Sequence, residues 1–112
     1  MTRFVTLTLS LVALMASAAG AEEDTRTQAA EWASRTGIIA GSATFCAMDE
    51  EVVEEYINKA QAKIASTTVD DLDLVAARIE FRNVYAASAA RAPVEGCDQF
   101  ARSFKRKLAL LD

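Results

Sequence analysis

The feature that most constrains the fold is a single pair of cysteines far apart in the chain. Cys46 and Cys97 are the only cysteines among the 112 residues. An even number of well-separated cysteines is typical of a disulfide in an exported protein, because compartments outside the cytosol are oxidising. A bond between them closes a loop of about 50 residues, for which chain entropy predicts about 4 kcal/mol, comparable to the net stability of a small domain. We therefore expect a Cys46–Cys97 disulfide.

Other roles for these cysteines fit the sequence less well. A cysteine nucleophile usually needs a basic partner, most often histidine, and the chain contains no histidine. Redox-active cysteines usually lie close together, as in C-x-x-C, and a zinc site needs four ligands, typically Cys and His. An intermolecular bond or a free thiol is the alternative to an internal disulfide. We predict no metal site.

The first residues indicate export. Arg3 precedes an apolar run over residues 4–19, and small residues follow up to Ala21, in the A-x-A arrangement of a cleavable secretory signal. A membrane-spanning helix needs about 20 apolar residues, whereas this run is shorter and contains hydroxyl side chains. We therefore predict a signal peptide over residues 1–21, with cleavage after Ala21 favoured over cleavage after Ala19. The remaining chain would be periplasmic or secreted, with no membrane insertion.

Residues 22–112 have the length of a single small domain. The full chain carries 12 basic and 16 acidic residues, which gives a net charge of −4. A nucleic-acid-binding protein is expected to be basic overall, so the acidic balance argues against that class of partner.

The pattern of residues after the predicted signal is helical throughout. Proline occurs once, at Pro93, alanine is abundant, and no segment alternates apolar and polar residues over the length of a strand. Apolar residues at helical spacing predict helices over residues 27–47, 49–66, 70–90 and 94–111. The predicted fold class is all-α, a small four-helix bundle. The disulfide would join the end of its first helix to the start of its fourth.

Local patterns add detail to these helices. Asp49 is a favourable N-cap, and Glu55 and Lys59 are spaced for an i,i+4 ion pair. Gly37 and Gly41 lie four residues apart among other small residues, which predicts that a neighbouring helix packs closely against the first. A ligand motif or a membrane-pairing motif is the alternative, and the polar residues of this segment argue against a bilayer.

The predicted third helix is apolar over much of its circumference. Leu72, Val75 and Ile79 share one side, and Phe81 and Tyr85 widen the apolar face. So wide a face is typical of a helix at the centre of a bundle. We therefore expect the helix over 70–90 to be the central one.

Residue patterns that would carry catalysis are weak. Asp70, Asp71 and Asp73 resemble the start of a calcium loop, but no central glycine follows, so helix capping explains them better. The acidic residues that a glycosidase would need lie in polar helical runs, and a serine triad would lack its histidine. No phosphate loop or dinucleotide fingerprint is present. We expect no enzymatic activity and no cofactor.

Two surface features are candidates for partner binding. The first is a basic cluster on the predicted fourth helix, formed by Arg102, Lys105, Arg106 and Lys107. The alternative is an ordinary solvated helix end, where basic residues complement the helix dipole. The second is Trp32, the single tryptophan, as an anchor either in the core or at an interface. Because the apolar side of the fourth helix is needed in the bundle, an acidic protein is preferred to an anionic membrane.

These features predict a small exported helical protein that binds another exported or envelope protein without catalysis. In size, export and cysteine placement it is similar to the acid-stress chaperones of the bacterial periplasm. It is equally similar to the helical immunity proteins that neutralise cell-wall-cutting toxins there. Both similarities are of architecture alone, and they imply protein binding of the chaperone or inhibitor type. A structural envelope or assembly subunit is the alternative, and a minimal enzyme or metal-binding protein is a remote one.

Overall fold

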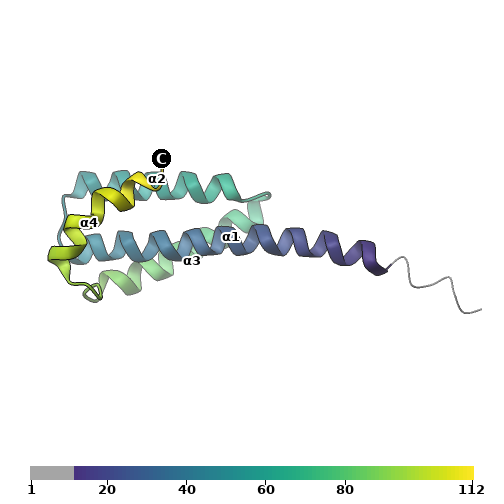
Figure 1. The fold of residues 1–112 in the computed structure, drawn as a ribbon, viewed down its shortest axis with the longest axis horizontal. Helices are drawn as coiled ribbons and strands as arrows, with labels where there is room; N and C mark the ends of the chain where they lie inside the picture. Colours follow the sequence, from purple (N-terminus) through teal and green to yellow (C-terminus); the bar gives the residue numbers. More distant parts are fainter. Residues whose placement is uncertain (1–11) are drawn as a thin grey trace, which may run out of the picture.

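The fold of the described chain is all-α (Figure 1). The computed structural model describes the backbone of residues 12–112 and the side chains of residues 28–112. Along these residues there are four helices and no strands: α1 (Val12–Phe45), α2 (Glu50–Thr67), α3 (Asp71–Ala89) and α4 (Cys97–Ala109). The predicted all-α fold with four helices is confirmed.

The start of α2 and the start of α3 lie where the sequence predicts them. The Asp49 side chain accepts a hydrogen bond from the backbone N–H of Glu51 at 2.9 Å. The Asp70 side chain accepts one from the backbone N–H of Asp73 at 2.8 Å. Each bond satisfies a backbone donor that the first turn of a helix leaves without an intrahelical partner. Helix capping is therefore the structural role of both residues.

The other two helices begin elsewhere than predicted. α1 starts at Val12 instead of residue 27, so its first turns overlap the predicted signal peptide. Residues 1–11 of that segment lie outside the described residues, and cleavage after Ala21 stays a prediction. α4 starts at Cys97 instead of residue 94, because a turn precedes it: the Gly96 N–H donates to the Pro93 carbonyl at 3.0 Å. Gly96 has a φ of 83°, which glycine adopts without strain.

The central helix is α1, and the prediction that the helix over 70–90 is central is wrong. Within the described chain α1 contacts each of the other three helices, whereas α3 contacts mainly α1. α1 and α3 run in the same direction side by side, α2 runs back along α1, and α4 crosses one end of the bundle toward α2 (Figure 1). The disulfide lies at the end of the bundle where α4 begins.

The close contact of α1 with α3 depends on two glycines. A Cβ atom placed on Gly37 would lie 2.9 Å from the carbonyl oxygen of Phe81. One placed on Gly41 would lie 2.5 Å from the carbonyl oxygen of Tyr85 and 2.6 Å from Cβ of Ser88. The predicted close packing at this pair of glycines is confirmed. Other small residues buried along α1 are Ala29, Ala33, Ala40 and Ala43.

This contact determines which face of α3 is buried. Ala77 and Phe81 are buried, whereas Leu72, Val75 and Ile79 are 77%, 52% and 52% exposed. The prediction that these last three pack in the core is wrong. The physical reason is that the small residues of α1 accept the narrow face around Ala77 and Phe81. In the described part of the chain no other helix covers the opposite face.

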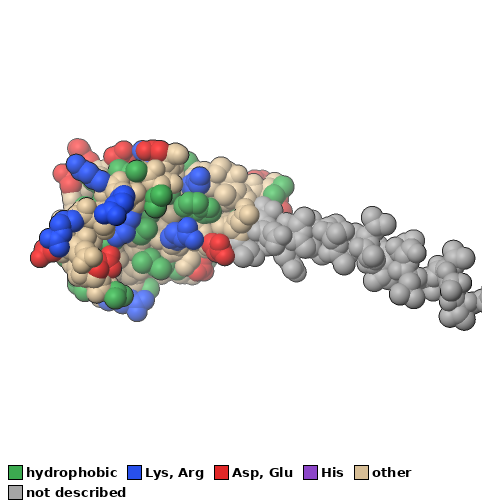
Figure 2. All heavy atoms as spheres, viewed as in Figure 1, with side chains coloured by type: hydrophobic (Ala, Val, Ile, Leu, Met, Phe, Trp, Pro, Cys, Tyr) green, Lys and Arg blue, Asp and Glu red, His purple; other side chains and the backbone are tan. Residues whose placement is uncertain are grey.

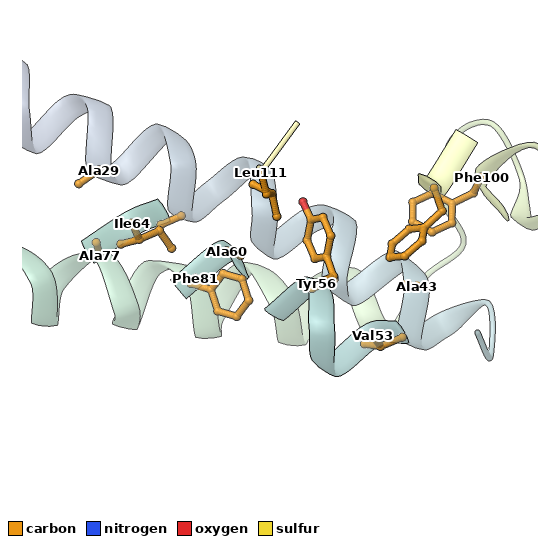
Figure 3. Packing of buried hydrophobic residues seen from close by; sticks show 13 residues of the cluster. Ala29, Ala43, Val53, Tyr56, Ala60, Ile64, Ala77, Phe81, Phe100 and Leu111 are labelled. Carbon is orange, nitrogen blue, oxygen red and sulfur yellow. The ribbon is translucent and has the colours of Figure 1, made fainter. Parts of the chain in front are cut away.

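The largest fully buried apolar side chains come from α2 and α4 (Figure 3). The rings of Tyr56 and Phe104 have centroids 5.5 Å apart, and those of Phe100 and Phe104 are 5.9 Å apart. Ile64 of α2 and Leu111 after α4 are also buried. The apolar face predicted for the last helix is therefore confirmed, and it packs against the bundle.

We predict that Gly41→Ala lowers the free energy of unfolding by about 1–3 kcal/mol, because the new methyl group overlaps the backbone of α3. At an exposed helical site the same change would instead stabilise the helix by about 1 kcal/mol. Gly37→Ala is the matched variant, with the smaller expected loss because its nearest contact is longer. Urea denaturation measures both. A stabilised Gly41→Ala variant would contradict the close approach of the two helices.

Candidate functional site

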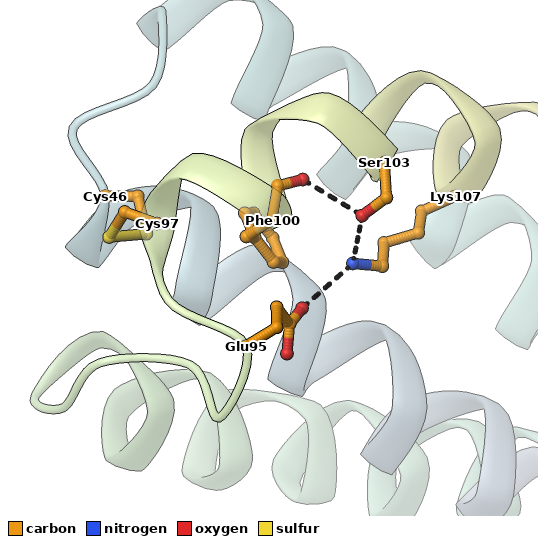
Figure 4. Close-up of polar contacts among 6 residues, drawn as sticks. All are labelled: Cys46, Glu95, Cys97, Phe100, Ser103 and Lys107. Carbon is orange, nitrogen blue, oxygen red and sulfur yellow. Dashed lines mark hydrogen bonds and ion pairs between the residues drawn. A yellow bond between two sulfur atoms is a disulfide. The ribbon is translucent and has the colours of Figure 1, made fainter.

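The predicted disulfide between Cys46 and Cys97 is present (Figure 4). It joins the residue that follows α1 to the first residue of α4, with the two Cα atoms 5.4 Å apart. Both cysteines of the chain are thereby used in a covalent tie, and neither is a free thiol. The bond holds the start of α4 against the end of α1.

An ion pair holds the opposite end of α4. Nζ of Lys59, on α2, lies 2.5 Å from Oδ1 of Asp112 and 3.6 Å from Oε1 of Glu55. The hydrogen bond to Asp112 is the main reason why the pKa of Lys59 lies above its ordinary value. The predicted Glu55–Lys59 pair is confirmed. The segment from Cys97 to the C-terminus is therefore attached at both of its ends.

Lys107 makes a third attachment on one flank of α4 (Figure 4). Its Nζ lies 3.3 Å from Oε1 of Glu95, donates to Oγ of Ser103 at 2.8 Å and lies 4.3 Å from the centre of the Phe100 ring. A hydrogen bond with its own backbone lowers the pKa of Glu95 most, and the bond from Lys107 lowers it further. The pair therefore ties α4 to the segment that leads into it.

The four basic residues predicted as a partner-binding cluster do not share one face of α4. An α-helix turns about 100° per residue, so Arg102 and Arg106 lie together, whereas Lys105 and Lys107 are separated by roughly 160°. Arg102, Lys105 and Arg106 are exposed, and within the described residues none of them has an ion-pair partner. Lys107 is half-buried and paired with Glu95. The outward cations of α4 are therefore Arg102, Lys105 and Arg106, which we call the cationic face of α4.

The surroundings of α4 are also basic on the face shown in Figure 2. Lys and Arg side chains gather over α4 and the adjoining parts of the bundle, while many of the acidic side chains lie toward the edges of this view (Figure 2). The chain as a whole has a net charge of −4. α4 itself holds four basic residues and one acidic residue, Asp98, so its local charge is opposite to that of the whole molecule, which attracts acidic partners.

Trp32, the second candidate, is half-buried and packs against the hydrophobic core. Two cations lie over its ring: the guanidinium carbon of Arg35 is 5.3 Å, and Nζ of Lys63 is 5.1 Å, from the ring centre. The Lys63 contact links α1 to α2, the Arg35 contact lies within α1, and both use the ring internally. They favour a core role for Trp32 over an interface role.

A groove lies beside α4, on the flank that carries Lys107. Its volume is about 520 Å³, and it is lined by α1, the end of α3, the segment before α4, and α4 itself. The lining includes Ile38, Arg91, Val94, Phe100 and Lys107. Sequence reasoning missed this groove, because its walls are far apart in the chain and meet only once the helices are packed.

Metal-ligand clusters and membrane-spanning helices are both absent from the described residues. In this part of the chain no three His, Cys, Asp or Glu side chains come together as a metal site would require. No helix of the same residues has the length and apolar character needed to cross a bilayer.

Comparison with known proteins finds no relative. No protein-family model matches the chain, and neither a curated protein nor a solved structure matches it. The function is therefore inferred from the surfaces of the chain itself.

The lowered pKa of Glu95 gives a testable pH dependence. A carboxyl group whose pKa is lower in the folded state stabilises the fold above its unfolded pKa, and this contribution is lost as the pH falls through the folded pKa. We predict that Glu95→Gln lowers the urea midpoint at pH 7. The difference in midpoint between this variant and the native protein should shrink as the pH falls below the ordinary pKa of 4.5, and it should disappear once the pH lies below the lowered pKa of the folded state.

Glu80→Gln is the control for this measurement. Glu80 is an exposed glutamate on α3 that has no ion-pair partner among the described residues. We expect the urea midpoint of the Glu80→Gln variant to differ little from that of the native protein at any pH. An effect of Glu95→Gln that persists in acid would show that the carboxylate charge is not what stabilises the fold.

Proposed function

We propose that this protein is a small exported helical protein that binds another protein without catalysing a reaction. We propose the cationic face of α4 as its binding surface. The observation that carries the proposal is the way in which α4 is held. One side of α4 is buried in the core, both ends of its segment are attached, and Arg102, Lys105 and Arg106 point outward.

Helix electrostatics alone does not account for these cations. Basic residues near a helix C-terminus are stabilised by the helix dipole, an effect confined to the last turn. Arg106 lies in the last turn of α4, whereas Arg102 lies near the middle of the helix. At an interface, arginine is among the residues that contribute most to binding. The helix dipole therefore does not account for Arg102, and its exposed guanidinium group can contact a partner.

The attachment of α4 favours recognition of a partner by a preformed surface. Ordering a flexible segment on binding costs free energy, and a helix that is already fixed avoids that cost. The positive charge of the face favours an acidic partner and speeds the encounter with it. The disulfide fits an oxidising compartment, which together with the predicted signal peptide supports a periplasmic or secreted location.

Two kinds of binding protein agree with this surface. An inhibitor or immunity protein needs a rigid preformed face, which the fixed α4 supplies. A stress chaperone needs apolar surface that becomes exposed in acid. Glu95 supports that second role, because its ion pair with Lys107 depends on a carboxylate that loses its charge in strong acid.

A structural or assembly subunit is the alternative function, favoured by the exposed apolar face of α3. Leu72, Val75 and Ile79 lie at helical spacing and are more than half exposed. Exposed apolar patches of this kind often mark contacts between subunits. A stable homo-oligomer with no other partner would support this alternative.

We predict that the double variant Arg102→Glu/Arg106→Glu weakens binding to an acidic partner by about tenfold. Each exposed charge contact contributes about 0.2–1 kcal/mol, and reversing a charge replaces attraction with repulsion. The partner is captured from the native compartment by the tagged protein, and its affinity for each purified variant is measured at two salt concentrations. Binding of the native protein should weaken as salt increases.

Arg78→Glu/Arg82→Glu is the matched control, because it reverses two exposed arginines at the same spacing on α3. We expect it to leave the affinity almost unchanged. Equal loss in both double variants would contradict the proposed surface. A one-to-one complex with a cell-wall-cutting enzyme would identify an inhibitor, and suppressed aggregation at about pH 2–3 would identify a chaperone.

A further inference from the structure

The groove beside α4 has mainly apolar walls. Ile38 and Ile39 of α1 form one side, Pro93 and Val94 form another, and the ring of Phe100 lies between the groove and the core. Ile38 is 48% exposed and Val94 is fully exposed, so large apolar side chains meet solvent at its mouth. Its volume of about 520 Å³ lies within the range of about 300–1,000 Å³ usual for small-ligand sites.

The charges that line the groove are unbalanced. Its charged lining residues are Arg91, Glu95 and Lys107. Glu95 and Lys107 neutralise each other as an ion pair. The guanidinium group of Arg91 has no hydrogen-bond or ion-pair partner among the described residues, so the groove retains one positive charge.

Lys107 also retains hydrogen-bonding capacity. A lysine ammonium has three N–H donors. Within the described chain two of them are used, by Glu95 and Ser103 (Figure 4). The Nζ atom lies over the Phe100 ring, where the polar part of the lining meets the apolar part. An anionic group placed there would meet an available donor directly beside an apolar wall.

We propose that this groove binds a fatty carboxylate, an unbranched monoanion with an apolar chain. The carboxylate is held by Arg91 and by the remaining donor of Lys107. The alkyl chain lies along Ile38, Ile39 and Val94, where it removes exposed apolar surface from water. This site does not depend on the cationic face of α4, and it adds a small-molecule ligand to the proposed protein-binding function.

The test is a titration of the isotope-labelled, disulfide-bonded protein with sodium decanoate, followed by amide chemical shifts below the micelle concentration. Decyltrimethylammonium, with the same chain and the opposite charge, is the matched probe. We expect decanoate to cause saturable shifts at Ile38, Val94 and Lys107. The cationic probe should bind about tenfold more weakly or not at all, because its head group is repelled by the unbalanced positive charge.

Two pairs of variants separate the head-group contact from the chain contact. Arg91→Glu should weaken decanoate binding about tenfold. Arg82 is an exposed arginine outside the groove, so Arg82→Glu should leave the affinity for decanoate unchanged. Val94→Asn should also weaken binding, and Leu72→Asn on α3 should not. Val94 and Leu72 are both highly exposed, so neither change is expected to disturb folding.

Three outcomes would overturn the proposal. The first is equal affinity for the two probes, and the second is the absence of saturation. The third is a set of shifts along Val75 and Ile79, which would place the ligand on α3 instead. None of them would affect the proposed protein binding by α4, because Arg102 and Arg106 do not line the groove.

Discussion

The disulfide between Cys46 and Cys97 is the constraint on which the rest of the structure depends. α4 has 13 residues, and an isolated helix of about that length is marginal in water. Its other attachments are buried rings and ion pairs of partly exposed side chains, and ion pairs open to solvent contribute little to stability. The covalent bond fixes where α4 begins, so the buried rings meet the core in one register. The cationic face and the groove exist only while α4 lies there.

The second determinant is the small-residue side of α1. Gly37 and Gly41 allow the backbone of α3 to approach α1 so closely that a Cβ atom at either glycine would overlap α3. This approach fixes α3 by its narrow face and leaves Leu72, Val75 and Ile79 in solvent. The same two helices contribute residues to the lining of the groove, so the α1–α3 contact and the disulfide together shape the groove.

Features that depend on residue counts or on nearby residues could be predicted from the sequence. The disulfide, the helical class, the caps at Asp49 and Asp70 and the glycine contact belong to this group. Periodicity shows which face of a helix is apolar, but it does not show what covers that face, so the central helix and the exposed side of α3 were predicted wrongly.

Lys107 was grouped with the other basic residues of α4 because they are close in sequence. Neighbours in sequence point in different directions around a helix, so closeness in sequence did not predict a shared face. The groove depends on three distant segments meeting and had no local signature.

The most direct test of this account is native-state hydrogen exchange, which compares the disulfide-bonded protein with a Cys46→Ser/Cys97→Ser variant. If the disulfide positions α4, the amides of Phe100 and Phe104 lose most of their protection in the variant. The amides of Ala40 and Ala43 in α1 should keep a much larger share of their protection against exchange. If the α4 amides remain as protected as in the disulfide-bonded protein, α4 is held without the bond, and the central claim is wrong.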